Sequence, residues 1–398
     1  MSNRRFPWDL TPTDFAREQE TATLAGEPPL DLTVSNPPAL GLGPGPEHFA
    51  DLDPATLARY APDPLGALPC REAVATYLAG HGADLGPEAI LLTASTSEAY
   101  GWLFKVLAPP GSAVAIPRPS YPLFDFLTHL EGVLPVSYNL FHHERWQLDR
   151  GSLEEALAQG AKAVVVVQPS NPLGACLSAG DRDWLLERCG AAGAAVIADE
   201  VFLDYADAST EELQSLAHAE ADARARASGV ALFVLSGLSK VVAAPQVKLG
   251  WIALLGTVTA ELRARLELVA DTYLSVSAAA QLLGPRLLAR GEALRAPIRE
   301  RLQANLEQID RAVASGAVLK RVSEPAGWSV VLRLPHPPEG ERDWAGLLLR
   351  EERLLTHPGH FYELDERHLV LSGLTEPAQL EEGLGRLLRR VEVGFEEG

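Results

Sequence analysis

The stretch LSGLSKVVAAPQVKLGW, residues 235–251, ends one apolar run, begins another and holds two lysines eight positions apart. The chain has 34 basic residues, and only five of them are lysine. An arginine guanidinium stays protonated and cannot form an imine, whereas a lysine amine can lose its proton and attack a carbonyl. A chain that uses so little lysine is expected to keep it where an amine is required. Lys240 and Lys248 are therefore candidate functional residues.

Seven short apolar runs alternate with helical stretches on both sides of this segment. They are AILLTA (89–94), SAVAIP (112–117), LPVSYNL (134–140), AKAVVVVQ (161–168), AAVIADE (194–200), ALFVLSG (231–237) and LGWIALLG (249–256). Several are continuous rather than alternating, which is typical of strands covered on both faces. They predict a mostly parallel α/β sheet, in which ligands bind beyond the carboxyl ends of the strands.

The rest of the chain predicts a smaller α+β unit. Residues 257–315 have apolar residues at helical spacing, and the last 80 residues or so are expected to form two strands and a helix. These are GWSVVLRLP (327–335), HLVLSGL (368–374) and PAQLEEGLGRLLRRVEV (377–393). The segment NPPALGLGPGPEHF (36–49) is rich in proline and glycine and predicts a loop.

Composition excludes several classes of protein. The net charge of −19 argues against a nucleic-acid partner, because phosphate binding needs clustered lysine and arginine. No apolar run approaches the ~20 residues of a membrane span, and none follows the arginines near the N-terminus. We therefore expect no membrane association and a cytoplasmic location. The three cysteines, Cys70, Cys176 and Cys189, show no CxxC spacing, so we expect neither a disulfide framework nor a metal site.

Polar residues follow several of the predicted strands directly. Ser95, Thr96 and Ser97 come after the first and open a helix. Hydroxyls and free backbone N–H groups at a helix start can bind a phosphate. The same residues also suit a helix N-cap with a capping box, and the sequence leaves both interpretations open.

The other strand ends carry an amide, an acid and the first lysine. Asn171 follows AKAVVVVQ within a proline-rich turn, where it also suits ordinary turn chemistry. Asp199 ends AAVIAD, and an acid there is desolvated and needs a cationic partner unless it simply caps a turn. Lys240 follows ALFVLSG. A phosphate cradle, a buried acid and a reactive lysine together are what pyridoxal phosphate requires.

With these motifs the chain resembles the class I/II aminotransferases of pyridoxal phosphate fold type I. The resemblance runs from LDLTVSNPP (30–38) through YAPDPLGALPCREAVATYL (60–78) to the C-terminal region. It implies a mostly parallel seven-stranded sheet in a large pyridoxal-phosphate-binding domain, residues 46–285. It also implies an N-terminal arm that forms part of the small domain (1–45) and a small C-terminal domain (286–398). A homodimer with shared active sites, an amino donor and a keto acceptor are expected as well.

The resemblance also implies a role for each site residue. Lys240 forms the Schiff base with the cofactor and moves the proton, Asp199 pairs with the pyridinium nitrogen, and Asn171 bonds the phenolic oxygen. Tyr121 in RPSYP stacks on the cofactor ring. The implied phosphate ligands are Ser95, Thr96, Ser97, Ser239, Lys248 as the cation, and Tyr60 from the neighbouring subunit.

Two positions depart from the family pattern. Phe202 stands where relatives have a tyrosine, and Tyr205 is a candidate replacement. Val370 stands where relatives carry an arginine that binds both oxygens of the substrate α-carboxylate. Either another group binds that carboxylate, or the amino substrate is not a standard α-amino acid. The candidates for such a group are Arg367, Arg118 and His360, and we expect the loop HPGHFY (357–362) to face the same space.

Two other activities stay open. The first is a lyase, decarboxylase or replacement enzyme on the same scaffold, which the missing arginine favours. The second is a regulator that uses the domain to sense a ligand. The acidic charge and the short segment ahead of LDLTVSNPP argue against a regulator.

Overall fold

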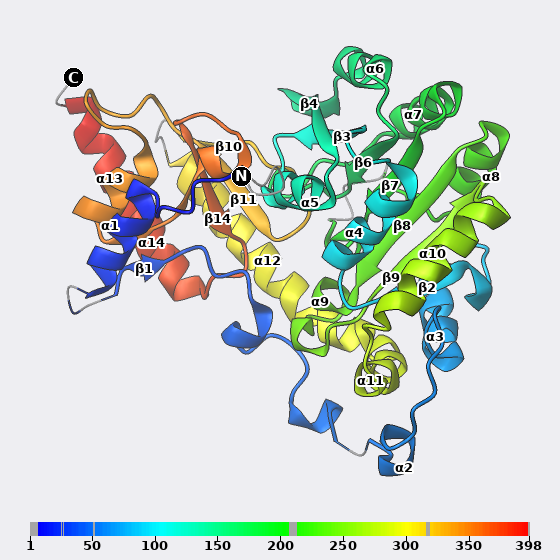
Figure 1. The fold of residues 1–398 in the computed structure, drawn as a ribbon. Helices are drawn as coiled ribbons and strands as arrows, with labels where there is room; N and C mark the ends of the chain where they lie inside the picture. Colours follow the sequence, from blue (N-terminus) through cyan, green and yellow to red (C-terminus); the bar gives the residue numbers. More distant parts are fainter. Residues whose placement is uncertain are drawn as a thin grey trace.

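The computed structural model of this chain describes residues 7–396 apart from residues 25, 27, 51, 207–212 and 316–318. Its largest feature is an eight-stranded sheet in the order β2-β9-β8-β7-β6-β3-β4-β5, with helices packed on both sides (Figure 1). The strands are β2 (Ile90–Thr93), β3 (Ala113–Arg118), β4 (Leu134–His143), β5 (Arg145–Leu148), β6 (Ala163–Val167), β7 (Ala195–Asp199), β8 (Ala231–Gly237) and β9 (Gly250–Gly256).

The predicted sheet is confirmed, with one strand added. Strands β4, β3, β6, β7 and β8 pair in parallel, whereas β9 runs antiparallel between β8 and β2. All seven predicted runs are strands of this sheet. The sequence did not predict β5, which pairs with β4 across a turn at Glu144, where φ is 63°.

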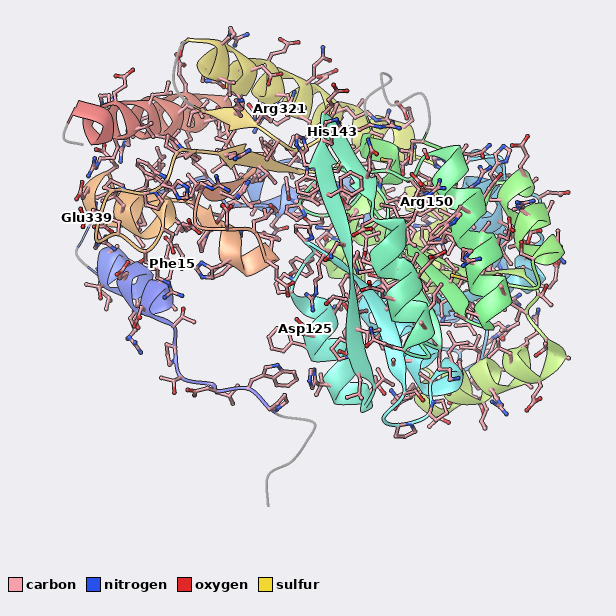
Figure 2. All side chains as sticks on the ribbon, turned by 90° about the horizontal axis from the view of Figure 1, so that it is seen from above. Phe15, Asp125, His143, Arg150, Arg321 and Glu339 are labelled. Carbon is pink, nitrogen blue, oxygen red and sulfur yellow. The ribbon has the colours of Figure 1, made fainter. Side chains whose placement is uncertain are left out.

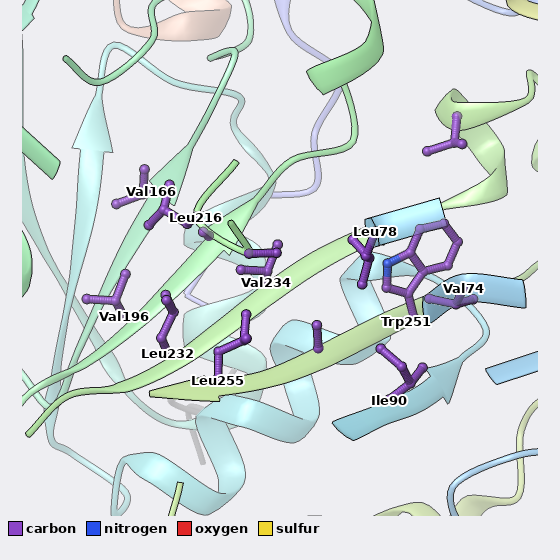
Figure 3. Close-up of a cluster of buried hydrophobic side chains, with 14 of the residues drawn as sticks. Val74, Leu78, Ile90, Val166, Val196, Leu216, Leu232, Val234, Trp251 and Leu255 are labelled. Atoms are coloured by element: carbon purple, nitrogen blue, oxygen red, sulfur yellow. The ribbon is translucent and has the colours of Figure 1, made fainter. Parts of the chain in front are cut away.

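Alternate residues of the central strands enter two separate hydrophobic cores. Val196 and Leu232 belong to the core in Figure 3, together with Leu78 of helix α3 (Leu68–Ala79) and Trp251 of β9. The residues next to them along the strands enter the core on the other face. Complete burial of one such side chain contributes about 1.5–3 kcal/mol. Burial on both faces is the physical reason for the continuous apolar runs.

Helices on the two faces of the sheet complete this part of the molecule. They are α4 (Thr96–Leu107), α5 (Leu123–Glu131), α6 (Arg150–Ala158), α7 (Ala179–Ala192), α8 (Ala219–Ala227), α10 (Ala260–Tyr273) and α11 (Ala278–Leu288). Helices α10, α11 and α12 (Gly291–Ala314) account for the helical spacing of apolar residues over 257–315. The predicted loop at 36–49 is a connection with two short 3-10 turns, η1 (Pro37–Leu40) and η2 (Pro46–His48).

A second, four-stranded sheet lies in the C-terminal part, in the order β10-β11-β14-β13. The strands are β10 (Lys320–Arg321), β11 (Ser329–Arg333), β13 (His357–Pro358) and β14 (His368–Ser372), with helices α13 (Trp344–Glu351) and α14 (Pro377–Glu396) beside them. The two strands and the final helix predicted here are confirmed, whereas α13 was not predicted. Phe15 of α1 (Asp14–Leu24) and Leu32 pack into the same core as Leu369 and Leu384, and Figure 2 labels Phe15 on this side.

Several hydrogen bonds join the two sheets, and two of them show which ends meet. The indole Nε1 of Trp146 in β5 donates to the carbonyl of Val322 at 2.6 Å, so the β4–β5 hairpin reaches the C-terminal part. Figure 2 shows its tip at His143 beside β10 at Arg321. The backbone N–H of Ser120, just after β3, donates to the carbonyl of Tyr362 at 3.2 Å. The carboxyl ends of the parallel strands therefore face the C-terminal sheet. Within the described residues no helix is long and apolar enough to span a membrane.

Candidate active site

A cavity of about 440 Å³ lies between the carboxyl ends of the large sheet and the C-terminal sheet. Of the ten residues predicted for the site, six line it, and they are Thr96, Ser97, Tyr121, Asn171, Asp199 and Lys240. The strands that precede them are β2, β3, β6, β7 and β8, whose carboxyl ends share one edge because β2 and β8 both run antiparallel to β9. The topology therefore brings together residues spread over 145 positions of the sequence.

Lys240 lies in the short helix α9 (Leu238–Val241), directly after β8. Its Nζ is 4.5 Å from the ring centroid of Trp328 and 5.5 Å from that of Phe202. Burial lowers the pKa of the Lys240 amine to about 8, although Asp199 opposes this shift. A substantial share of the amine is then neutral near pH 8, and a neutral amine is the nucleophilic form.

Asp199 ends strand β7 with a side chain that is only 8% exposed. Its Oδ1 accepts the N–H of Val201, and its Oδ2 accepts the hydroxyl of Tyr100, each at 3.1 Å. Burial raises the pKa of Asp199 to about 6, while these hydrogen bonds and Lys240 oppose the rise. Near pH 7 the site therefore holds a mostly ionised, poorly hydrated carboxylate that favours a cation beside it.

Tyr100 also lines this cavity and was not predicted from the sequence. It lies one helical turn after Thr96 on α4, and both side chains line the cavity. Residues four apart on a helix share a face, so this spacing could have identified it.

Asn171 is oriented by a residue from the other sheet. The hydroxyl of Ser329, the first residue of β11, donates to Asn171 Oδ1 at 2.9 Å. The amide nitrogen of Asn171 is then left as a donor, so this side chain suits an anionic oxygen.

The start of helix α4 has the predicted N-cap and also places two hydroxyl side chains in the cavity lining. Ser95 is the N-cap and accepts the N–H of Glu98 at 3.2 Å, while Glu98 accepts the N–H of Ala94 at 2.7 Å. Ser95 is committed to this N-cap and lies outside the cavity lining, whereas Thr96 and Ser97 line the cavity. Their hydroxyls have no hydrogen-bond partner in the part of the chain that the structure describes.

Ser239 and Lys248 flank a close approach of two strands. Gly237 and Gly250 are paired across β8 and β9, and a Cβ on Gly250 would lie only 3.0 Å from the hydroxyl of Thr93 at the end of β2. The glycines thus let three strand ends converge beside the start of α4. Ser239 and Lys248 lie two residues from these glycines and outside the cavity lining, and Lys248 is exposed with φ at 58°.

Tyr60 lies apart from the cavity. Its side chain is 83% exposed, and it borders a separate hollow of about 270 Å³ together with Trp102 and Gln281. Within one chain, the structure does not bring Tyr60 to the other predicted residues.

The three alternatives for a carboxylate-binding group all have acidic partners. Arg118 pairs with Asp125 at 2.6 Å and with Glu363 at 2.5 Å. The other two pairs are Arg367–Asp365 at 2.5 Å and His360–Asp343 at 3.6 Å. None of the three lines the cavity.

The loop 357–362 does face the cavity, as expected, through His357 and Tyr362. Tyr205 does not, because its hydroxyl donates to the backbone carbonyl of Lys240 at 2.8 Å. Phe202 packs against Trp328 with ring centroids 5.4 Å apart. Trp328, Thr33 and Ser35 also line the cavity and were not predicted.

The groups in this cavity fit pyridoxal phosphate. An amine of lowered pKa, a buried carboxylate, an amide donor and an aromatic face each match one part of the cofactor. The hydroxyls at the start of a 12-residue helix match its phosphate. The residues that could hold it are Lys240, Asp199, Asn171, Tyr121, Thr96 and Ser97.

Comparison with known proteins agrees with this geometry. Human tyrosine aminotransferase is 26% identical over 270 residues, which are 63% of this chain and 57% of that protein. The match thus spans little more than half of the relative. An S-alkyl-thiohydroximate lyase of Arabidopsis thaliana is 32% identical over 192 residues, 48% of this chain and 39% of the relative.

Among solved structures, the alanine aminotransferase of Pyrococcus furiosus superposes with a TM-score of 0.86 at 21% identity, over 99% of this chain and all of that one. This likeness shows the fold. The family model for aminotransferase class I and II matches residues 46–387, and the chain therefore belongs to the class I and II aminotransferase family.

Proposed function

We propose that this protein is a pyridoxal-phosphate-dependent aminotransferase that uses a Schiff base at Lys240. It would exchange an amino group between an amino acid or amine and a keto acid. The observation that carries the proposal is a lysine amine of lowered pKa in the same cavity as a buried carboxylate at the end of the neighbouring strand. In the overall exchange the donor carbon gives up its nitrogen and one hydrogen and gains a carbonyl oxygen, while the acceptor carbon undergoes the reverse change.

Three residues of the cavity would act on the reacting part of the cofactor. Lys240 would bond the cofactor aldehyde and, once released by the donor, carry the proton removed from the donor carbon. Asp199 would keep the pyridine nitrogen protonated, and Asn171 would donate to the phenolic oxygen. When bound, the cofactor supplies an electron sink for the carbon that loses its proton.

Other residues would position the cofactor. Tyr121 would stack on its ring, and the phosphate would lie at the start of α4. The proposed phosphate ligands are Thr96, Ser97, Ser239 and Lys248, with Ser95 contributing through the cap that orders this turn.

We also propose a homodimer with shared active sites, in which Tyr60 reaches the partner's phosphate. The exposure of Tyr60, which lies outside the cavity lining of its own chain, supports this arrangement. The domains would be 46–285 and 286–398, with the arm 1–45 belonging partly to the small one, and the core shared by Phe15 and Leu369 supports that division. A cytoplasmic location stays a prediction, with which the three free cysteines agree.

A lyase is the second candidate. The match to the Arabidopsis lyase favours it, as does the absence of the family arginine at Val370. The reactions begin alike, because both remove a proton from the donor carbon, and they differ in whether the nitrogen stays on the cofactor.

The test is the visible absorption of the purified protein, before and after addition of amino acids and amines. A visible band that borohydride abolishes, and that is missing from Lys240→Ala but present in Lys162→Ala, supports the assignment. Loss of the band with one donor, and its return with a keto acid, indicates amino transfer. A band that persists while ammonia and a keto product accumulate indicates a lyase. A reducible band in Lys240→Ala contradicts the role of Lys240.

A further inference from the structure

One histidine lies where the C-terminal sheet faces the cavity. In β14, Val370 pairs directly with Val331 of β11 and with His357 of β13. Directly paired residues in antiparallel strands point to the same face, as do residues two apart in one strand. Ser329, Val331, Val370 and His357 therefore share a face, and two of them, Ser329 and His357, line the cavity. This face of the C-terminal sheet is therefore the one toward the cavity.

Of the two residues of this face that line the cavity, His357 is the one that can carry a positive charge, and its environment keeps it neutral. Arg333 and His368 lie farther along the same face and outside the cavity lining. Burial lowers the pKa of His357, although Asp31 opposes the shift. Its Nδ1 lies 3.0 Å from the hydroxyl of Tyr362, which fixes the ring. Its Nε2 has no hydrogen-bond partner among residues 7–396 as far as the structure describes them. A neutral imidazole offers one donor or one acceptor there, according to its tautomer.

The charges in the cavity disfavour a second carboxylate. Among the described lining residues, the full charges near pH 7 are those of Asp199 and Lys240, and the proposed function commits both to the cofactor. Arg118, Arg367 and His360 lie outside the lining and have acidic partners. A carboxylate without a cationic partner in a poorly hydrated site is strongly disfavoured.

We propose that the amino donor presents a neutral hydrogen-bonding group, a hydroxyl in the simplest case, to His357 in place of an α-carboxylate. This inference rests on the proposed aminotransferase function. A hydroxyl both donates and accepts, so it matches either tautomer of His357, whereas a carboxylate only accepts. The donors are then amino alcohols and related uncharged amines, and their products are carbonyl compounds that lack an adjacent carboxylate. Because donor and acceptor use the same cavity in turn, the inference also narrows the acceptor of the proposed function to an aldehyde or ketone in preference to a 2-keto acid.

The test compares donors that differ only at this group. L-Phenylalaninol, L-phenylalanine and 2-phenylethylamine are given to the protein loaded with pyridoxal phosphate, and loss of the visible band is followed in single turnovers. The compared quantity is the maximal single-turnover rate constant divided by the half-saturating donor concentration. We expect this ratio to be at least about tenfold higher for phenylalaninol than for phenylalanine, because only the acid brings an unpaired charge. An equal or higher value for phenylalanine overturns the inference.

A pair of variants tests His357 itself. His357→Phe should reduce the ratio of the values for phenylalaninol and 2-phenylethylamine from about ten to about one, because the variant loses one hydrogen bond to the hydroxyl. His357→Gln keeps a neutral donor and acceptor and should retain most of the preference. A preference that survives in His357→Phe overturns the assignment to His357.

A binding measurement separates this inference from the proposed function. The acid 3-phenylpropanoate and the alcohol 3-phenylpropan-1-ol have no amino group and cannot react. Isothermal titration of both into the loaded protein should show tighter binding of the alcohol, even if no donor ever converts the cofactor. In that event the aminotransferase proposal fails and the inference on the neutral group stands. The inference is overturned if the acid binds more tightly, if the two compounds bind equally, or if neither binds detectably.

Discussion

The replacement Asp199→Asn should stabilise the protein without cofactor while impairing the site. The pKa of Asp199 rises from 3.8 to about 6 on folding because the carboxyl group is buried. At about 1.4 kcal/mol per pKa unit, the ionised carboxylate costs the fold about 3 kcal/mol. Asparagine has no such cost and can keep both hydrogen bonds, because its carbonyl oxygen accepts from Val201 and the Tyr100 hydroxyl can accept from its amide.

The effect has a defined pH dependence. Because the folded pKa of Asp199 lies above the unfolded value, the folded protein binds more protons between about pH 4 and pH 6 than the unfolded chain does. Stability from this group is present below pH 4 and is lost as the pH rises through that window. The advantage of Asp199→Asn should therefore be about 1 kcal/mol at pH 4.5 and about 3 kcal/mol at pH 8.

The assay is equilibrium urea unfolding of the cofactor-free protein, followed by tryptophan fluorescence at pH 4.5 and pH 8. Asp84→Asn is the matched control, because Asp84 is exposed, and its stability should differ from wild type by no more than about 0.5 kcal/mol at either pH. Cofactor binding by Asp199→Asn should weaken at the same time. The reasoning is refuted if Asp199→Asn is less stable than wild type at pH 8, or if its advantage is the same at both pH values.

Three further predictions follow from particular contacts. Gly174→Ala should lower the free energy of unfolding by at least about 2 kcal/mol, because φ is +69° and the new Cβ would lie 2.6 Å from the carbonyl oxygen of Glu324. The control Gly193→Ala, with φ at +66° and no atom within 4 Å of the new Cβ, should lower it by only about 1 kcal/mol. Equal losses of the two variants in urea unfolding would contradict this prediction. Tyr205→Phe removes the hydrogen bond to the Lys240 carbonyl and should cost about 1 kcal/mol by the same assay, so unchanged stability would be inconsistent with that bond. Burial raises the pKa of each of the three cysteine thiols to about 12. A disulfide reagent at pH 8 should therefore label no cysteine in the folded protein and all three in urea. Rapid labelling of the folded protein would count against this prediction.

Short-range patterns were sufficient for the large sheet and insufficient for its edges. The seven predicted strands are apolar because both faces are buried, and this burial is visible in consecutive residues. Strand β5 was missed because it has four residues with exposed Arg145 at its start. Its pairing with β4 and the hydrogen bonds of Trp146 to Val322 and Glu324 hold it in place. The pairing of β1 (Leu30–Asp31) with β12 (Leu354–Leu355) depends on contacts across more than 300 residues, which no local pattern encodes.

The sequence by itself determined the parallel sheet and the order of polar residues along its edge. Its scarcity of lysine also made Lys240 a candidate functional residue. The sheet and this order follow from the sequence because burial on both faces selects apolar residues and because the carboxyl ends of parallel strands meet at one edge. Only the tertiary structure decided which other groups complete the site. Ser329 bonds Asn171 across 158 positions, and His357 reaches the cavity through its register with Val370. Such contacts depend on how two sheets pack and on which acids neutralise each arginine, and both are set by the whole fold.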